Sequence, residues 1–234
     1  LSRLSANYFS HPSKKLNVVG ITGTNGKTTT SFLVVSMFKQ IAKAGLIGTT
    51  GYFYDGIRKE APVTTPESLD LQRLLYDMLK RGISYVSMEA SAHGITLHRL
   101  QDVEFRVKVF TNISQDHLDF YKSMEDYARA KLSFFDRETK AVVNMDDRWG
   151  KEIERRTDVT TYGFDRRCDI HPVSFVSDIH GIKADILTPL GKISINSPLV
   201  GDYNLYNIMA CIGVGLCMDI EPEVIAKGIA DLDG

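Results

Sequence analysis

The sequence predicts an α/β fold, in which a doubly wound, mostly parallel sheet carries a smaller antiparallel sheet beside it. Two observations predict this fold. Between residues 16 and 144, short apolar runs typical of buried strands alternate with longer segments of helical periodicity. Between residues 168 and 197, the pattern changes to short alternating runs separated by turns, which is typical of antiparallel strands. Alternation of the first kind favours helices on both faces of a parallel sheet.

The first strand is expected over residues 16–21, and a glycine-rich loop follows it directly. A helix is expected next, over residues 27–44, because apolar residues recur every four positions and Gly45 suits a helix end. A strand over residues 46–54 follows, with a turn at residues 55–56.

The second helix is expected to begin within Thr64-Thr65-Pro66-Glu67. Thr65 can cap it, Pro66 fits the first helical position, and Glu67 complements the helix dipole. Residues 81–82 close it. The remaining elements are expected as strands at 83–88, 107–110 and 141–144, a helix at 124–135, antiparallel strands at 170–176, 181–187 and 192–195, and helices at 204–218 and 222–232.

The composition is that of an ordinary soluble globular protein, with 43% hydrophobic and 24% charged residues in 234. A net charge of −1 gives no electrostatic reason to expect nucleic acid or an anionic membrane as a partner. The longest near-apolar run, residues 208–218, is too short to span a bilayer. Cys168, Cys211 and Cys217 lack metal-site spacing, so we expect inert thiols in a reduced, cytoplasmic protein.

Two parts of the chain are expected to differ in role. Residues 1–15 are polar and irregular, and are interpreted as an entry linker from a missing N-terminal domain. Residues 16–234 are interpreted as one central ATP-binding domain, with the antiparallel subregion at about 168–197. The chain lacks an initiator Met and ends abruptly, which favours a piece of a longer protein.

The loop after the first strand has the features of a phosphate-binding loop. In residues 22–30, small side chains let backbone N–H groups point at phosphate oxygens, and the following helix adds its positive end. Lys27 would reach the β- and γ-phosphates, and the Thr28 hydroxyl would ligate Mg²⁺. Ile21 stands where the strict pattern has Gly, so the loop is a variant. The alternative is a glycine-rich turn that binds no ligand.

Polar residues also follow two later strands. In a parallel sheet, ligands bind at the carboxyl ends of the strands, so residues 23–28, 89–93 and 112–117 are expected to share one crevice. Glu89 could ligate Mg²⁺, or be a solvated acid at a strand end. His117 could be a metal ligand or a surface residue, while Asp116 and Asp119 suit helix caps.

Three further polar residues lie on predicted helices. From residue chemistry alone, Lys131 is expected on a solvated helix face. Asn204 and Asn207 are spaced to face the same way, and carboxamides can read an adenine edge. The alternative is that Asn204 caps the helix and Asn207 is exposed.

Taken together and in order, these segments resemble the ATP-dependent Mur ligases of peptidoglycan synthesis. The resemblance covers essentially the whole chain and is strongest to the branch that adds a diamino acid. Several short segments carry it: residues 22–30; 64–66 ahead of 69–71; 89–94; 111–112 with 116–119; 127–131; 144 with 146–147; and 204 with 207.

The resemblance implies metal and phosphate roles. Thr28 and Glu89 would ligate one Mg²⁺, and Glu89, His117 and Lys131 would serve a second. Lys131 would be carbamylated, because an ammonium repels a cation whereas a carbamate offers anionic oxygens. Lys27, His117 and Lys131 would be the catalytic residues. The ATP phosphates would be held by Thr24, Asn25, Gly26, Lys27, Thr28, Thr29 and Thr30.

The resemblance also implies substrate contacts. Asn207 would contact adenine, and Thr64, Thr65, Ser91 and Arg99 would bind the UDP-MurNAc-dipeptide. This sequence departs from the family at three positions. Family members often have Ser where Ala92 stands, some have Gln where Leu97 stands, and a His often occupies the position of Tyr203.

The implied reaction is amide formation through an acyl phosphate. The D-Glu carboxylate would attack the ATP γ-phosphate, and the amine of lysine or diaminopimelate would then displace phosphate. Family members also carry an N-terminal domain that holds uridine and a C-terminal domain that reads the amino acid, so this piece is expected to be inactive alone. The alternatives are a folylpolyglutamate synthetase-like ligase, a P-loop switch or regulatory ATPase, and a non-catalytic nucleotide-binding module.

Overall fold

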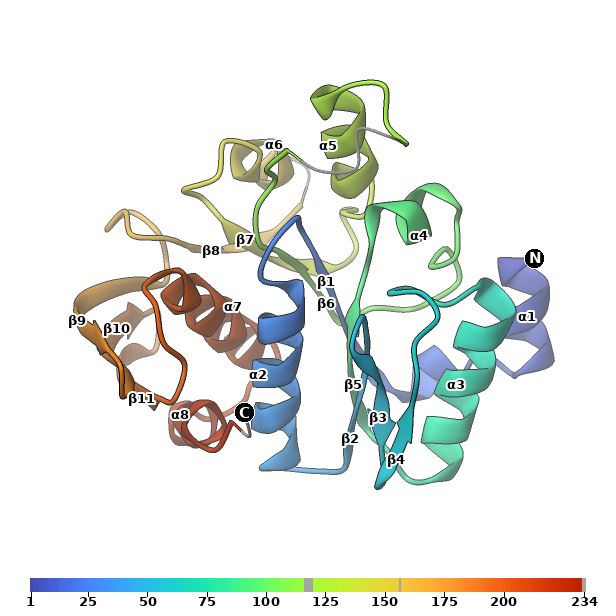
Figure 1. Ribbon diagram of the computed structural model, residues 1–234, viewed down its shortest axis with the longest axis horizontal. Helices are drawn as coiled ribbons and strands as arrows, with labels where there is room; N and C mark the ends of the chain where they lie inside the picture. The colour runs from blue at the N-terminus through green and yellow to red at the C-terminus, as the bar shows by residue number, and fades with distance from the viewer. Residues whose placement is uncertain (116–119, 156, 233–234) are drawn as a thin grey trace.

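The computed structural model describes residues 1–115, 120–155 and 157–232. Within them the chain forms one eight-stranded sheet in the order β4-β3-β2-β5-β1-β6-β7-β8 (Figure 1). All neighbouring pairs from β2 to β8 are parallel, while β3 and β4 form an antiparallel edge. The strands are β1 (Asn17–Thr22), β2 (Ala44–Gly48), β3 (Gly51–Tyr54), β4 (Ile57–Lys59), β5 (Tyr85–Glu89), β6 (Val107–Phe110), β7 (Lys140–Asn144) and β8 (Val159–Tyr162).

Helices cover both faces of this sheet, which confirms the doubly wound arrangement. Strand β1 lies between β5 and β6 and is buried on both faces: Val19 and Ile21 pack into one core, and Val18 packs into the other. The Val19 core lies under α2 (Lys27–Lys39), α7 (Tyr203–Cys217) and α8 (Pro222–Ala230). The opposite face carries α3 (Ser68–Lys80), α4 (Ala92–Thr96), α5 (Met124–Leu132) and α6 (Gly150–Glu154).

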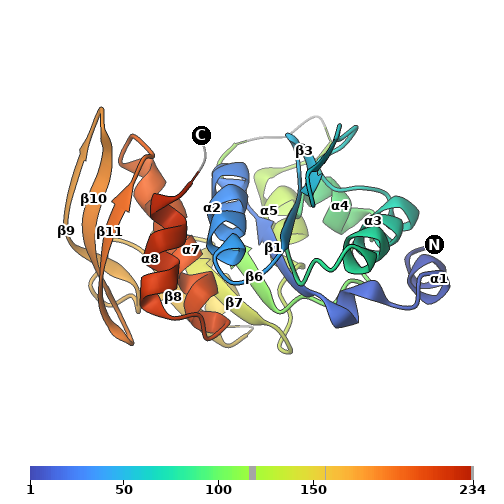
Figure 2. The same ribbon diagram turned by 90° about the horizontal axis from the view of Figure 1, so that it is seen from below.

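The smaller sheet is antiparallel, as predicted, in the order β11-β10-β9. Along β10 (Gly181–Thr188) buried Ile182 and Ile186 alternate with more exposed residues, so one face joins the α2/α7/α8 core. Strands β9 (His171–Asp178) and β11 (Gly191–Ser197) flank it. Figure 2 shows this sheet at the end of the molecule beside α8, far from α1 and α3.

The N-terminal fifteen residues differ from the irregular segment expected. They form a helix, α1 (Ser2–Tyr8), and a 3₁₀ turn, η1 (Pro12–Lys15), both of which contact α3. The expectation failed because the buried face of α1 is made of small residues, Ser2, Ser5 and Ala6, rather than an apolar stripe. The large side chains of this helix point outward instead.

Several predicted boundaries were also wrong. Helix α2 ends at Lys39, and Gly45 lies inside β2 rather than at a helix end. The strand expected over 46–54 is two strands, β2 and β3, which pair antiparallel. Helix α3 begins at Ser68 with Glu67 as N-cap, so Thr65 is not the cap. Sequence periodicity also missed α4, α6 and β8, each only four or five residues long.

Within the described residues, no helix is both long and apolar enough to cross a bilayer.

Candidate functional site

The loop between β1 and α2 depends on two glycines. Gly26, the N-cap of α2, has φ 82°, and Gly23 has φ 152°. A Cβ on Gly23 would lie 1.9 Å from Thr111 Oγ1, and one on Gly26 would lie 2.3 Å from Asn207 Oδ1. Glycine is therefore required at both positions, because neighbouring side chains occupy the space that a Cβ would need.

The loop is hydrogen-bonded to the segment that follows β6. The Thr24 and Asn25 amides donate to Asn112, at 2.7 Å to its carbonyl oxygen and 3.0 Å to its Oδ1. Thr111 Oγ1 donates to Asn25 O at 2.7 Å, and the Ser114 amide donates to Thr24 Oγ1 at 3.0 Å. Thr24 and Asn25 thus shape the loop that leads into the first turn of α2.

Two lysines converge on this loop. Lys27 Nζ donates to Gly23 O at 3.0 Å and to Thr24 O at 2.8 Å. Lys131 Nζ donates to the same Gly23 oxygen at 2.7 Å and lies 4.7 Å from the Tyr127 ring centroid. Lys131 is only 1% exposed, so the expectation of a solvated helix face is wrong. The turn of α5 points this lysine into the crevice, where two ammonium groups lie beside the loop.

Glu89, the last residue of β5, is fully buried. Its Oε1 accepts from Thr28 Oγ1 at 3.0 Å and from the Thr49 amide at 3.1 Å, and its Oε2 accepts from Thr49 Oγ1 at 3.0 Å. All these donors are neutral, and no described residue forms an ion pair with it. A buried carboxylate without a cation carries a large desolvation cost. Oxygen ligands of this kind suit Mg²⁺, so the residues present fit a divalent cation.

The predicted substrate residues form a second group beside Glu89. Thr65, fully buried, donates its hydroxyl to Glu89 O at 2.9 Å and accepts from the Ser91 amide at 2.9 Å. Ser91 Oγ caps α4 by accepting from the Gly94 amide. Arg99 donates to Thr65 O at 3.0 Å and pairs with Glu67. Thr65 thus holds the end of β5, whereas Thr64 Oγ1 lies 3.1 Å from Thr49 Oγ1.

Of the predicted nucleotide residues, Asn25, Gly26 and Asn207 line a cavity of about 270 Å³ beside the loop. Asn207 is buried; it accepts from Thr30 Oγ1 at 3.2 Å and donates to Asn204 Oδ1 at 2.8 Å. The alternative with an exposed Asn207 is therefore wrong. Tyr206 donates to Asp146 at 2.9 Å, and its pKa is raised by burial and by that carboxylate. The cavity is lined by Asn25, Gly26, Thr111, Asn112, Asn144, Asp146, Asp147, Tyr203, Tyr206 and Asn207.

Not every predicted residue can be placed. His117, with Asp116 and Asp119, lies outside the described residues. Across the described ranges, no three His, Cys, Asp or Glu side chains cluster as a metal site. Thr28 and Glu89 meet where β1 and β5 end. Helix α5 carries Lys131 to the Gly23 carbonyl oxygen of the adjoining loop.

Sequence reasoning missed Thr49 and Tyr206, and it singled out Asp146 only as part of the resemblance, without a role. Thr49 directly follows the buried strand β2, and Asp146 follows β7 by two residues. The strand-end rule that selected Glu89 could therefore have selected both of them. No signal in the sequence distinguishes Tyr206 from Tyr203, the other aromatic residue of α7.

The cysteines agree with the expectation of inert thiols. All three are free, and burial raises the pKa of each one, to about 11 for Cys168. The thiolate forms are therefore disfavoured.

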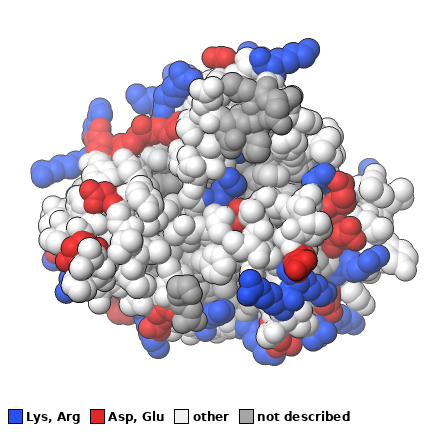
Figure 3. Space-filling model, viewed as in Figure 1, with Lys and Arg blue, Asp and Glu red and all other residues white. Residues whose placement is uncertain are grey.

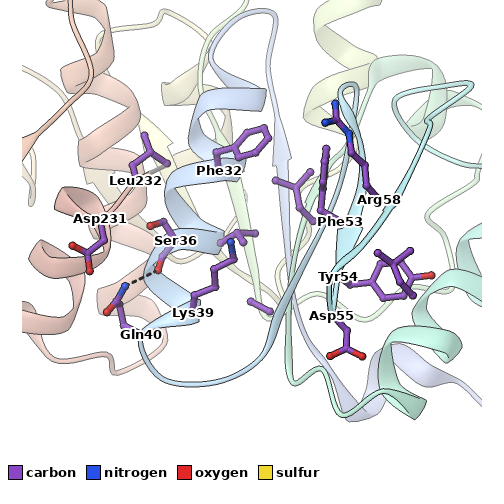
Figure 4. A pocket seen from close by; sticks show the side chains of 15 residues that line it. Phe32, Ser36, Lys39, Gln40, Phe53, Tyr54, Asp55, Arg58, Asp231 and Leu232 are labelled. Atoms are coloured by element: carbon purple, nitrogen blue, oxygen red, sulfur yellow. Dashed lines mark hydrogen bonds between the residues drawn. The ribbon is translucent and has the colours of Figure 1, made fainter. Parts of the chain in front are cut away.

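On the face seen in Figure 3, basic and acidic side chains are interspersed around the rim. A larger cavity of about 650 Å³ lies between α2 and the β3–β4 hairpin. Figure 4 shows Phe32 and Lys39 from α2 on one wall and Phe53 and Arg58 on the other. None of the predicted site residues lines it.

Comparisons with known proteins point to one family. A family profile described as the Mur ligase middle domain matches residues 21–215. A UDP-N-acetylmuramoyl-L-alanyl-D-glutamate–2,6-diaminopimelate ligase from Gloeobacter violaceus is 40% identical, over 100% of this chain and 48% of its own length. The chain thus spans about half the length of the curated relatives it matches.

Solved structures show the same fold. A 2,6-diaminopimelate ligase structure of the same description superposes with a TM-score of 0.89 at 26% identity, covering 100% of this chain and 50% of that one. The folylpolyglutamate synthase of Mycobacterium tuberculosis superposes with a TM-score of 0.81 at 15% identity, covering 100% of this chain and 62% of that one. The second likeness concerns the fold alone. With its residues 21–215 matching the middle domain, this chain belongs to the Mur ligase family.

Proposed function

We propose that this chain is the central ATP-binding part of a ligase that adds a diamino acid to UDP-MurNAc-L-Ala-D-Glu during peptidoglycan synthesis in the cytoplasm. The single observation that carries the proposal is the convergence of Lys27, Glu89 and Lys131 on the crevice beside the β1–α2 loop. The names of the relatives support meso-diaminopimelate over lysine as the amino acid.

The loop and its two lysines suit a phosphoryl transfer between anions. The substrate carboxylate and the ATP γ-phosphate repel each other, so positive groups must stand beside both. The first turn of α2 offers backbone N–H groups and the positive end of its dipole. Lys27 would exchange its loop carbonyl partners for phosphate oxygens and stabilise the charge on the transferring group.

Thr28 and Glu89 would hold Mg²⁺, with His117 and Lys131 added for a second ion. A bound Mg²⁺ supplies charge neutralisation to the phosphoryl group in transfer. The Thr28 hydroxyl directs its proton at Glu89 Oε1, so the lone pairs of Thr28 Oγ1 stay available for a cation.

Lys131 would act as a carbamate. Its ammonium would first lose a proton; the free amine would then attack CO₂, giving a carbamate anion and a second proton. Burial at 1% exposure excludes bulk water from the product, and the neighbouring cations would stabilise it. The loss of positive charge would also end the ammonium's hydrogen bond to Gly23 O.

Two features support a role as one part of a longer chain. The relatives are about twice as long as the matched region. In addition, α1 presents Leu4 and Tyr8 to solvent at 72% and 80% exposure. A helix with small residues inside and large apolar residues outside is expected to be covered by another domain. Residues 1–234 alone are therefore expected to lack ligase turnover.

The direct test is ATP-dependent phosphate release by the full-length protein with UDP-MurNAc-L-Ala-D-Glu. We expect turnover with meso-diaminopimelate, and little with L-lysine or with folate plus glutamate. Lys27→Ala is the matched control and should lower kcat by at least about a hundredfold. Turnover with folate but not with the muramyl substrate would overturn the proposal.

A further inference from the structure

The carboxylate of Glu89 is held by a threonine that follows a different strand. Thr49 comes directly after β2, whereas Glu89 ends β5, and the two are 40 positions apart. Thr49 contributes both of its hydrogen-bond donors: its amide to Oε1 at 3.1 Å and its hydroxyl to Oε2 at 3.0 Å. Thr49 is itself exposed while Glu89 is fully buried, so Thr49 is the member of the pair that faces the crevice.

Counting protons fixes the direction of these bonds. As a carboxylate, Glu89 only accepts, so the one hydroxyl proton of Thr49 is directed at Oε2. The contact of 3.1 Å between Thr49 Oγ1 and Thr64 Oγ1 must then be donated by Thr64. A chain of hydroxyls therefore runs from Thr64 through Thr49 to Glu89.

The same count shows which oxygen remains for a cation. Oε1 accepts two hydrogen bonds, from Thr28 and from the Thr49 amide, which uses both of its lone pairs. Oε2 accepts one, from Thr49, and keeps a lone pair. Thr49 thus settles both the orientation of the carboxylate and the oxygen left to bind metal.

The backbone at the end of β2 lies close to the Glu89 carboxylate. A Cβ on Gly48 would lie 2.4 Å from Glu89 Oε1, so only glycine lets the end of β2 approach so near. The branched side chain of Thr49 restricts its own rotation, which favours one hydroxyl position.

We infer that Thr49 is a positioning residue, which orients Glu89 for the divalent cation and links that carboxylate to Thr64 of the muramyl-substrate segment. This inference rests on the proposed function, because it assumes a cation at Glu89 and a substrate at Thr64. It assigns to Thr49 no contact with reacting atoms.

The test measures Mn²⁺ binding to the full-length protein by electron paramagnetic resonance, with a non-hydrolysable ATP analogue and no turnover. Thr49→Val keeps the amide and the branched shape but removes the hydroxyl, and should weaken Mn²⁺ binding by about tenfold, as is usual for groups that orient a metal ligand. Thr49→Ser keeps the hydroxyl and should bind Mn²⁺ nearly as the parent does. Equal melting temperatures would show that all variants are folded.

A second readout tests the link to Thr64. Thr49→Val and Thr64→Val should each raise the KM for UDP-MurNAc-L-Ala-D-Glu, and the double variant should raise it no further than the larger single change. Fully multiplicative effects would contradict the link.

The outcomes separate this inference from the proposed function. If Glu89→Gln loses Mn²⁺ while Thr49→Val binds it normally, the metal site stands and the inference is wrong. If Thr49→Ser binds Mn²⁺ as weakly as Thr49→Val, the hydroxyl is not responsible and the inference is wrong again. If Glu89→Gln binds Mn²⁺ normally, the proposed metal site itself fails.

Discussion

Two buried charged groups in this molecule differ in whether an oppositely charged side chain lies beside them. Lys108, on β6, is 6% exposed and forms an ion pair with Asp136, while its ammonium also lies 5.1 Å from the Phe134 ring centroid. Glu89, at the end of β5, is fully buried and accepts only from neutral donors among the described residues.

The difference separates structure from function. At Lys108 the protein supplies the opposite charge, so the pair is complete within the fold. At Glu89 the residues that the structure describes supply none, so a bound cation would offset the cost of burying the carboxylate. A buried charge left without its counter-charge therefore indicates where a ligand binds, and the predictions below contrast the two places.

The largest contrast is expected in activity on changing the two buried lysines. In the full-length protein, Lys131→Ala should lower kcat by about 10²–10³-fold, because the carbamate oxygens that would hold the second cation are lost. Added acetate should restore part of the rate by refilling that site. Lys108→Met, the matched control, should leave kcat unchanged. An unaltered rate in Lys131→Ala would remove the proposed carbamate.

A smaller contrast is expected in stability when each acid is made neutral. Without divalent cations, Glu89→Gln should raise the free energy of unfolding by about 1 kcal/mol or more, because a buried charge without a counter-charge is removed while the amide keeps neutral partners. Asp136→Asn should lower it by about 1–3 kcal/mol, since Lys108 is left buried without its counter-ion. Solvent screening at the half-exposed Asp136 limits the loss to that range. Urea titration of both variants measures this, and equal losses would erase the distinction.

The smallest effect concerns pH. Partial burial raises the pKa of Asp136, but the hydrogen bond and charge of Lys108 outweigh it and hold the pKa below its usual value. The ion pair should thus contribute its full stability above the unfolded pKa of about 3.9, and lose it as pH falls through the lower folded value. Urea titrations between pH 5 and pH 2 should show a steeper loss of stability in the parent than in Asp136→Asn, because other carboxyls with a lowered pKa, such as Asp185, titrate in both.

Most of the fold could be predicted because its signals are local. The strand β1, the glycine loop and the start of α2 are encoded by neighbouring residues, and the period-2 pattern of β9 to β11 needs no partner to be recognised. Segments without such a pattern were missed. Helix α1 buries small residues instead of large apolar ones. Helices α4 and α6 are too short to show a helical repeat of apolar residues.

The sequence by itself determined most of the longer elements and which edge of the sheet carries the polar residues, because periodicity, glycine positions and strand ends are properties of short segments. Only the tertiary structure decided that Lys131 is buried against Gly23, 108 positions away, that Thr65 holds the end of β5, and that Thr49 covers Glu89. The physical reason is that burial and hydrogen-bond partners depend on which distant segments pack together, and no local pattern records that choice.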